Sequence, residues 1–465
     1  MTEHKAHTEK ENNDQLNVSM ARLTFPAYGT AVLTVSHGLI DSFFLSKISY
    51  TAAAAVGGIF SFLAMCGFLL RNFAQAGGIV ANQHIGARQS ESVAKAFSVC
   101  LTMGVILGGV LASIIYGLSD RIPLWMGFSD ELSQMSTEYM RLACFHIFLQ
   151  SISFSYMVFI SIHGFTSWNF TLIVTMNVLN IAGNFILLQW NGGEYFSVSS
   201  VAMASIFASI IPILMEFYFV HSKMGIRLIP WVGKNTFRDL ARQISKIGIP
   251  SSLFPVSLQL NLLALVVFIN QLGPEMLSTQ VYSINIIMLT VAWTTAVAQS
   301  SQIYISRLVG SSGFDQAEQK LKQTLTWGIT GALLITSCFC VFSDELFGLM
   351  TTNAVILQQG AIILMMGLIL EPLRAVNMIT LASLNAAGDA KYPGLLSIVM
   401  MWVIGVPMSW FFGIHLAYGL VGIYIGRIID ESLRALMVYL RWRSRLWQTK
   451  GITFDPHMQL ATKGN

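Results

Sequence analysis

The stretch IGIPSSLFPVSLQLNLLALVVFINQLGP, residues 247–274, has no charged side chain between Lys246 and Glu275. It is long enough to cross the hydrocarbon core of a bilayer, which takes roughly 20 apolar residues in a helix. The whole chain has this character: 54% of its 465 residues are hydrophobic and only 11% are charged, against about 25% charged residues in soluble domains. We therefore predict an all-α integral membrane protein.

Similar stretches recur along the chain and predict twelve transmembrane helices. Lys and Arg gather in the loops after spans two, six, eight, ten and twelve. Because basic residues near span ends resist translocation, these loops and both termini are expected to be cytoplasmic. The predicted spans are 22–46, 53–82, 96–118, 138–162, 168–188, 198–220, 247–271, 277–305, 324–343, 354–386, 393–414 and 417–439.

An internal repeat relates the two halves of the chain. FPAYGTA, which begins span one, resembles GIPSSLF, which begins span seven, and Pro26 precedes Gly86 by the same separation as Pro250 precedes Gly310. Six spans per half make the repeats parallel, which is an architecture of transporters. The predicted parts are a cytoplasmic tail (1–20), an N-lobe (21–221), a cytoplasmic connector (222–246), a C-lobe (247–441) and a second cytoplasmic tail (442–465).

The connector has the pattern of an amphipathic helix. Phe237, Leu240 and Ile244 recur at helical spacing, with basic residues between them. Such a helix lies on the membrane interface. It is either a joint between moving lobes or a passive linker.

Ionisable and amide side chains inside the predicted spans are the functional candidates, since polar groups at membrane depth are costly. Asp41 lies late in span one among apolar neighbours, where a carboxylate can load a proton or hold a sodium ion. Asn177, Asn180 and Asn184 share one face of span five. They either pack helices together or help to form an ion site with Asp41.

Other polar residues in the spans are weaker candidates. Glu371 and Arg374 are three residues apart in span ten, where they either pair locally or line a substrate cavity. Further candidates for lining that cavity are Arg71 in span two, Asn177 in span five and Glu431 in span twelve. Glu216, late in span six, is expected to snorkel to the cytoplasmic interface.

Several segments together resemble a known family, the multidrug and toxic compound extrusion (MATE) transporters, which belong to a larger group that includes polysaccharide and lipid flippases. The resemblance extends over nearly the whole chain and implies a MATE/MOP-type fold of two six-helix lobes. The segments are IDSFF (40–44), NQHIGARQ (82–89), the span-five asparagines, LNAAGDAKYP (384–393) and GVPMSW (405–410).

The resemblance also implies an ion-coupling site. In the DinF-like prokaryotic branch, the positions that match Asp41, Asn180, Asn184 and Ser205 form a proton or sodium site. That branch has an acid where this chain has Asn184, so one formal charge fewer favours H⁺ over Na⁺, with Na⁺ at Asp41 and Asn180 the alternative. The NorM-like branch has an acidic residue in span seven, where this sequence offers Gln259 and Asn261.

The predicted function is secondary active antiport: export of small organic, cationic or amphiphilic compounds across a bacterial inner membrane in exchange for H⁺ or Na⁺. A dedicated natural-product exporter or a flippase for a lipid-linked precursor is the alternative. An enzyme is not expected, because the sequence has no HExxH or GxSxG motif and no clustered His or Cys ligands. We expect a monomer that contacts membrane lipid, with no nucleic-acid partner and no cofactor.

Overall fold

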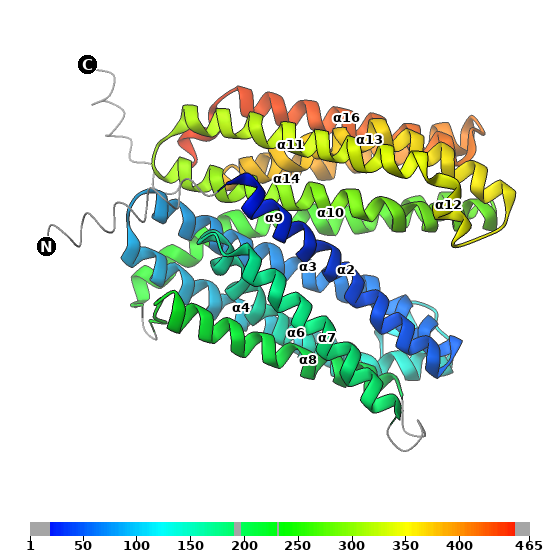
Figure 1. Ribbon diagram of the computed structural model, residues 1–465, viewed down its shortest axis with the longest axis horizontal. Coiled ribbons are helices and arrows are strands. Elements are labelled where there is room, and N and C mark those ends of the chain that lie inside the picture. The colour runs from blue at the N-terminus through cyan, green and yellow to red at the C-terminus, as the bar shows by residue number, and fades with distance from the viewer. Residues whose placement is uncertain (1–18, 190–196, 230–231, 452–465) are drawn as a thin grey trace, which may run out of the picture. The chain divides into compact units, whose positions relative to one another are not determined.

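The computed structural model describes residues 19–189, 197–229 and 232–451, and within these ranges every regular element is a helix (Figure 1). The predicted tails therefore lie largely outside the described residues. In chain order the helices are α2 (Met20–Ile48), α3 (Tyr50–Gly86), α4 (Ser90–Leu118), α5 (Ile122–Trp125), α6 (Asp130–Ile162), α7 (Thr166–Gln189), α8 (Val198–Tyr218), η2 (Phe219–Lys223), α9 (Lys234–Asn270), α10 (Pro274–Gly310), α11 (Phe314–Val341), α12 (Ser343–Gly348), α13 (Ala354–Ala386), α14 (Lys391–Met400), η3 (Met401–Gly405), α15 (Val406–Trp410), η4 (Phe411–His415), α16 (Gly419–Arg443) and η5 (Leu446–Thr449).

The long helices coincide with the predicted spans. Eleven helical segments of the described chain are long and apolar enough to cross a membrane. The twelfth predicted span is α16, which is 25 residues long but contains four charged residues in its middle. These are Arg427, Asp430, Glu431 and Arg434.

The chain divides into two compact units whose borders differ from the predicted lobes. Unit 1 extends to Ala81 and resumes over Glu91–Gly248, whereas unit 2 takes Asn82–Ser90 and continues from Ile249. Helix α3 therefore begins in unit 1 and ends in unit 2. The prediction of one lobe over 21–221 assumed that every span belongs wholly to one half of the protein.

The separate connector helix predicted within 222–246 is not a separate element. Helix α9 begins at Lys234 and continues without a break through Ile247 to Asn270, so connector and span seven are one helix. Leu240, Ile244 and Ile247 are all buried. Pro250 and Pro255 lie inside this helix.

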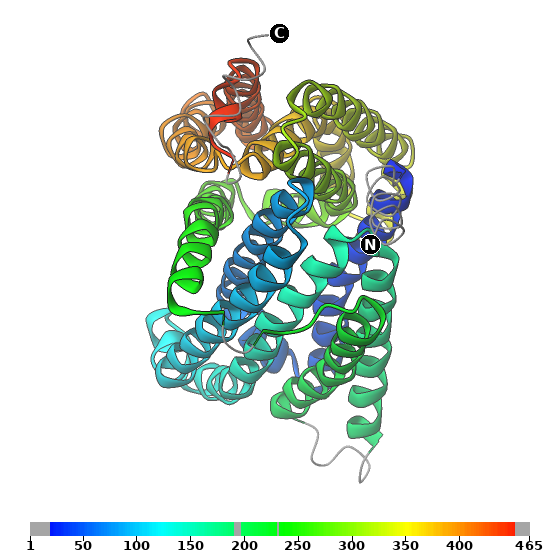
Figure 2. The ribbon, with the colours of Figure 1, turned by 90° about the vertical axis from the view of Figure 1, so that its left-hand side faces the viewer.

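The helices of unit 1 pack against one another in a series of pairs. Helix α6 contacts α8, α8 contacts α7, and α7 contacts α2; α7 and α8 run side by side in both ribbon views (Figures 1 and 2). Leu45, Ile59 and Met140 lie in its buried apolar cluster. This packing places the polar face of α7 between α2 and α8.

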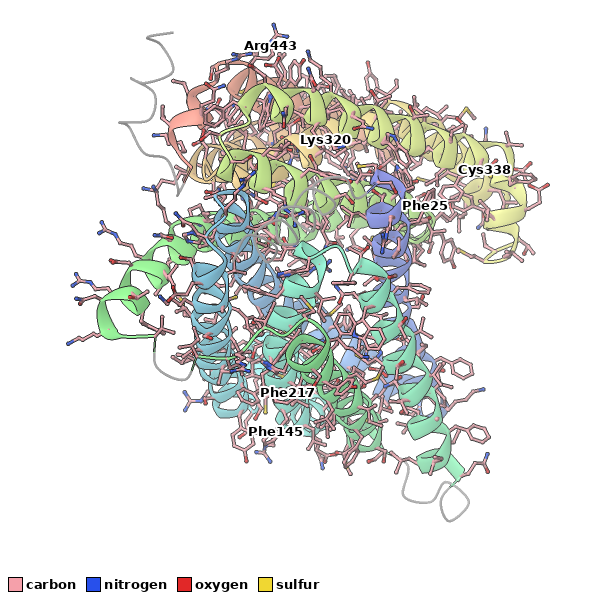
Figure 3. All side chains as sticks on the ribbon, turned by 60° about the vertical axis from the view of Figure 1, so that its left-hand side comes forward. Phe25, Phe145, Phe217, Lys320, Cys338 and Arg443 are labelled. Atoms are coloured by element: carbon pink, nitrogen blue, oxygen red, sulfur yellow. The ribbon has the colours of Figure 1, made fainter. Side chains whose placement is uncertain are left out.

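The outer surfaces of these helices are apolar. The side chains of Phe25, Phe145 and Phe217 are 56%, 54% and 51% exposed (Figure 3). Large apolar side chains at this exposure are expected on a surface that faces lipid acyl chains.

In unit 2, α13 packs against α10, α11 and α16. The predicted span eleven is α14, η3, α15 and η4 in succession, so it contains two π-helical turns that the sequence did not predict. Its second half lies close to α16: a side chain at Gly422 or Gly426 would meet the backbone of Phe412 or Ser409. The α16 helix is thereby held beside span eleven.

The ends of α3 and α10 meet in a reciprocal contact that reflects the internal repeat. A side chain at Gly86 would meet the carbonyl group of Arg307, and one at Gly310 would meet the carbonyl group of Gln83. Gly310 and Arg307 are the repeat counterparts of Gly86 and Gln83. Nearby, Nδ2 of Asn82 donates a 2.7 Å hydrogen bond to Oγ of Ser306, its own counterpart.

Candidate functional site

Asp41 lies at the contact between α2 and α8. Its side chain is buried, with 8% of the residue exposed. Oγ of Ser205 on α8 donates a 3.0 Å hydrogen bond to Oδ2 of Asp41, and Nδ2 of Asn180 on α7 donates to Oγ of Ser205 at 3.0 Å. Three helices therefore meet at this carboxylate.

The second asparagine of the pair completes the cluster. Nδ2 of Asn184 donates to the carbonyl oxygen of Asn180 at 3.0 Å and to Oδ1 of Asn180 at 3.3 Å. Asn180 and Asn184 are fully buried. The structure thus brings together Asp41, Asn180, Asn184 and Ser205, the four residues expected to form the ion-coupling site.

Two oxygen atoms in this cluster have no hydrogen-bond partner among the described residues: Oδ1 of Asp41 and Oδ1 of Asn184. Buried polar atoms are nearly always partnered, so such atoms call for a ligand. A proton on the carboxylate, a water molecule or a small cation would satisfy them, because hard cations prefer oxygen ligands. Within the described chain there is no cluster of three or more His, Cys, Asp or Glu side chains that could hold a metal ion.

The surroundings of Asp41 leave its charge uncompensated by Arg or Lys in the described part of the chain. The nearest basic group is His37, one turn earlier on α2, whose Nε2 lies 3.9 Å from Oδ2 of Asp41. The ring of His37 stacks on that of His146 from α6, with the ring centres 6.0 Å apart. This environment is therefore compatible with a neutral Asp41. It is equally compatible with an ionised Asp41 that binds a cation.

Asn177 has a different setting from its two neighbours on α7. Its Nδ2 donates to the carbonyl oxygens of Leu33 on α2, at 3.2 Å, and of Ile173, at 3.0 Å. The bond to Leu33 joins α7 to α2, which is the packing role considered for this residue. Its role as a substrate-cavity residue stays a prediction.

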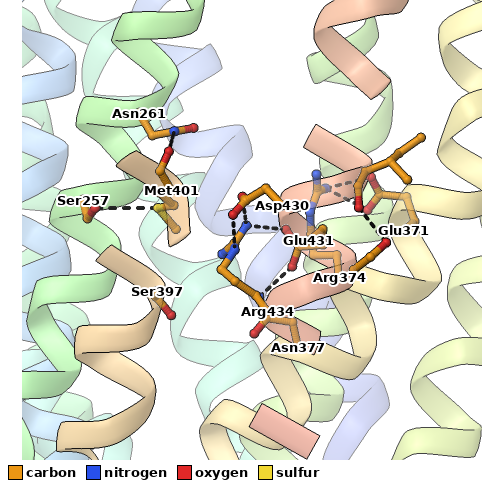
Figure 4. Close-up of polar contacts among 12 residues, drawn as sticks. Ser257, Asn261, Glu371, Arg374, Asn377, Ser397, Met401, Asp430, Glu431 and Arg434 are labelled. Atoms are coloured by element: carbon orange, nitrogen blue, oxygen red, sulfur yellow. Dashed lines mark hydrogen bonds and ion pairs between the residues drawn. The ribbon is translucent and has the colours of Figure 1, made fainter. Parts of the chain in front are cut away.

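The buried acids of unit 2 are paired with arginines, and two of these groups are shown in Figure 4. On α13, Nη1 of Arg374 donates to both carboxylate oxygens of Glu371, at 2.7 and 2.8 Å. Local pairing at this spacing was one of the two possibilities that the sequence left open. It lowers the cost of burying either charge.

A second ion pair network joins α16 to α13 (Figure 4). Nη2 of Arg434 lies 2.8 Å from Oδ2 of Asp430 and 2.6 Å from Oε2 of Glu431. Nδ2 of Asn377 on α13 donates to the remaining oxygen of Glu431 at 2.6 Å. Sequence reasoning missed Arg434 and Asn377, although the spacing of Asp430 and Arg434 is that of an i,i+4 pair.

The remaining candidates are placed as follows. Arg71 is partly buried on α3 in unit 1. It is not one of the residues that form the cluster between α2, α7 and α8. Nδ2 of Asn261 on α9 donates to the carbonyl oxygen of Met401 at 3.4 Å, and so stabilises the first π-helical turn. The snorkelling expected for Glu216 is wrong: this residue is fully buried, and Oγ of Ser153 on α6 donates a hydrogen bond to its carboxylate.

Comparison with known families decides the class of this protein. The family model MatE matches it twice, over residues 26–186 and 250–411. The chain belongs to the MatE family. The two matches begin at Pro26 and Pro250, the residues that align the two halves of the sequence, and they confirm the internal repeat. As a MatE protein, the chain is a membrane transporter and not an enzyme.

Relatives of known sequence support this assignment over the full length. The chain is 30% identical to the uncharacterized transporter YisQ of Bacillus subtilis, over 93% of this chain and 96% of the relative. It is 23% identical to the probable multidrug resistance protein YoeA of the same organism, over 96% and 97% of the two chains.

Solved structures confirm the fold. A crystal structure of MATE in the bent conformation matches with a TM-score of 0.85 at 19% identity, over 94% of this chain and 96% of that one. This MatE protein therefore has twelve membrane helices in two six-helix lobes, as the sequence predicted.

Proposed function

We propose that this protein is a secondary antiporter that exports small organic, cationic or amphiphilic compounds in exchange for protons, with Asp41 as the coupling residue. The names of the relatives support multidrug export, since YoeA and the Thermotoga maritima NorM, at 20% identity, are both described as probable multidrug resistance proteins. We also propose that it is a monomer of the bacterial inner membrane, the location that its resemblance to the DinF-like branch implies. The alternation of its basic loops supports cytoplasmic termini.

One observation carries the proposal: Asp41 is a buried carboxylate with a free oxygen and no Arg or Lys partner in the described structure. The buried acids of unit 2, by contrast, have arginine partners. A buried carboxylate without an arginine partner can load and release a proton. Asp41 fits this role, and Glu371 and Glu431 do not.

The chemistry of coupling follows from the free oxygen. A proton on Oδ1 of Asp41 neutralises the charge and leaves the hydrogen bond from Ser205 to Oδ2 intact. The proton shifts the transporter between its two access states only by the difference in its affinity for them. Transport of one cation outwards for one proton inwards then follows if the substrate binds better to the state in which Asp41 is ionised.

Sodium is the competing coupling ion. Oδ1 of Asp41 and Oδ1 of Asn184 are available oxygen ligands, but an amide in place of a second acid leaves a single formal charge to attract Na⁺. We therefore expect H⁺ to drive transport and Na⁺ to contribute little.

Uptake of ethidium into proteoliposomes tests this function. A lumen more acidic by about one pH unit supplies about 1.4 kcal/mol per proton, enough for about tenfold accumulation. We expect the wild type to accumulate ethidium under this gradient, and not under a sodium gradient of equal size at constant pH. Accumulation under sodium alone would replace the proton in the proposal. No accumulation under either gradient would contradict it and direct attention to a dedicated natural product or lipid-linked substrate.

A further inference from the structure

Unit 1 contains a second buried carboxylate that the coupling site does not use. Glu216 lies near the end of α8 and is 0% exposed. Oγ of Ser153 on α6 donates a 2.6 Å hydrogen bond to its Oε1. Its Oε2 has no partner in the described part of the chain. Like Asp41, Glu216 therefore has a free oxygen that a proton would satisfy.

The groups that face Glu216 are polar, and none of those described is a Lys or Arg. Besides Ser153, the phenol of Tyr156 on α6 is close enough to interact electrostatically with it. The hydroxyl of Tyr156 lies 3.3 Å from Nε2 of His221 on η2. Nδ1 of His221 lies 2.6 Å from the carbonyl oxygen of Ile226 and donates to it, because a carbonyl oxygen can only accept. No described Lys or Arg forms an ion pair with Glu216.

A line of polar side chains follows the contact between α6 and α8. On α6, His146, Gln150 and Ser153 are spaced four and three residues apart, which places them on one face. On α8, Ser205, Ser209 and Glu216 are spaced four and seven apart, which also defines one face. We call these six residues the α6–α8 seam.

Hydrogen bonds run along the part of the seam that is nearest to Asp41. Nε2 of Gln150 donates to Nε2 of His146 at 2.8 Å, so Nδ1 of His146 carries the proton and donates to Oγ of Ser209 at 3.1 Å. Oγ of Ser209 donates in turn to the carbonyl oxygen of Ser205 at 2.8 Å. Ser205 is the residue whose hydroxyl binds Asp41.

The rest of the seam, between Ser209 and Glu216, spans about 10 Å along the axis of α8. Pro212 lies there inside α8, and it has no N–H to donate to the carbonyl group of Ala208. Phe145 and Phe217, the sequence neighbours of His146 and Glu216, point outwards (Figure 3). The polar face is thereby enclosed between the two helices and screened from the apolar surface.

We propose that Glu216 is the group through which the coupling proton exchanges with the cytoplasm, and that the α6–α8 seam connects it to Asp41. The proposal rests on the proposed function, because it needs a coupling proton at Asp41. When Asp41 gives up its proton, Glu216 takes one up on Oε2 and later releases it near η2. One proton leaves one carboxyl group and one arrives at the other, so the summed charge of Asp41 and Glu216 is unchanged.

The seam places polar side chains between the Asp41 cluster and Glu216, inside the contact of α6 and α8. Basic residues follow η2, namely Lys223 and Arg227, and the distribution of such residues predicts that this end is cytoplasmic. The path from Ser205 to Glu216 measures about 16 Å along α8. It covers about half of the hydrocarbon thickness of a bilayer.

The variant Glu216→Gln tests the proposal in reconstituted full-length protein. Its amide oxygen still accepts from Ser153, but it cannot carry a proton. We expect ethidium uptake driven by a pH gradient to slow by at least about tenfold, since proton-transfer groups contribute this much or more. Exchange of ethidium across the membrane at equal pH, which needs no net proton movement, is expected to continue at the wild-type rate. Glu216→Asp is expected to restore part of the driven uptake.

The matched control is Glu138→Gln, which removes an exposed carboxylate of α6 outside the seam and is expected to change neither rate. Glu216→Gln with wild-type driven uptake would overturn the inference alone. Equal loss of driven uptake and exchange would also overturn it, since that result indicates a structural role. A wild type that fails to respond to the pH gradient would overturn the proposed function together with the inference.

Discussion

Replacing Asp41 with asparagine is expected to reduce ethidium uptake driven by a pH gradient to the background of protein-free liposomes. The amide oxygen can still accept the hydrogen bond from Ser205, so the helix contact is retained. The amide cannot bind or release a proton, and the coupling reaction is lost. Initial rates of fluorescence change in proteoliposomes measure the effect.

Asp344→Asn is the matched control, because it makes the same chemical change at an exposed position on α12. It is expected to transport as the wild type does. Size-exclusion profiles in detergent show whether both variants are folded. Driven uptake by folded Asp41→Asn at the wild-type rate would exclude Asp41 as the coupling residue.

The second large effect is expected at the reciprocal contact of α3 and α10. A methyl group at Gly86 would overlap the carbonyl group of Arg307, and one at Gly310 would overlap that of Gln83. Neither contact can be relieved by a side-chain rotation, because both involve backbone atoms. We expect Gly86→Ala and Gly310→Ala each to lower stability by about 3 kcal/mol or more, at the upper end of overpacking effects. The apparent Tm in detergent measures this loss.

Gly57→Ala on the same helix α3 is the control for Gly86→Ala. Nothing lies within 4 Å of a side chain at Gly57, and alanine is the better helix former by about 1 kcal/mol. An unchanged or slightly raised Tm is expected. If Gly86→Ala melted at the same temperature as Gly57→Ala, the close approach of the two helix ends would be wrong.

The spans and the internal repeat could be predicted from the sequence because each depends on local composition. Uncharged stretches of membrane length and the recurring Pro26 and Pro250 were sufficient. The continuous helix α9 was not predicted, since hydropathy changes at Lys246 while the helical backbone does not end there. The assignment of Asn82–Ser90 to unit 2 depends on contacts with α10 that no local pattern records.

The candidate site was predictable in part. Asp41 stood out as a single acid in an apolar span, and its grouping with Asn180, Asn184 and Ser205 was implied by family resemblance and not by spacing. Glu216 was misplaced, because its position near a span end suggested an interface residue. Ser153 on α6, which donates a hydrogen bond to its carboxylate, is 63 positions away in the chain. Only the packing of α6 on α8 brings the two together.

The most direct test of the central claim, that Asp41 exchanges a proton for substrate, is proton release on ethidium binding by purified protein in weakly buffered detergent solution. Linkage requires that if protonation weakens substrate binding, substrate binding must release protons to the same extent. Ethidium is expected to acidify the solution of the wild type and to leave that of Asp41→Asn unchanged, although both proteins bind it. Equal proton release from both proteins, or none from a wild type that binds ethidium, would contradict it.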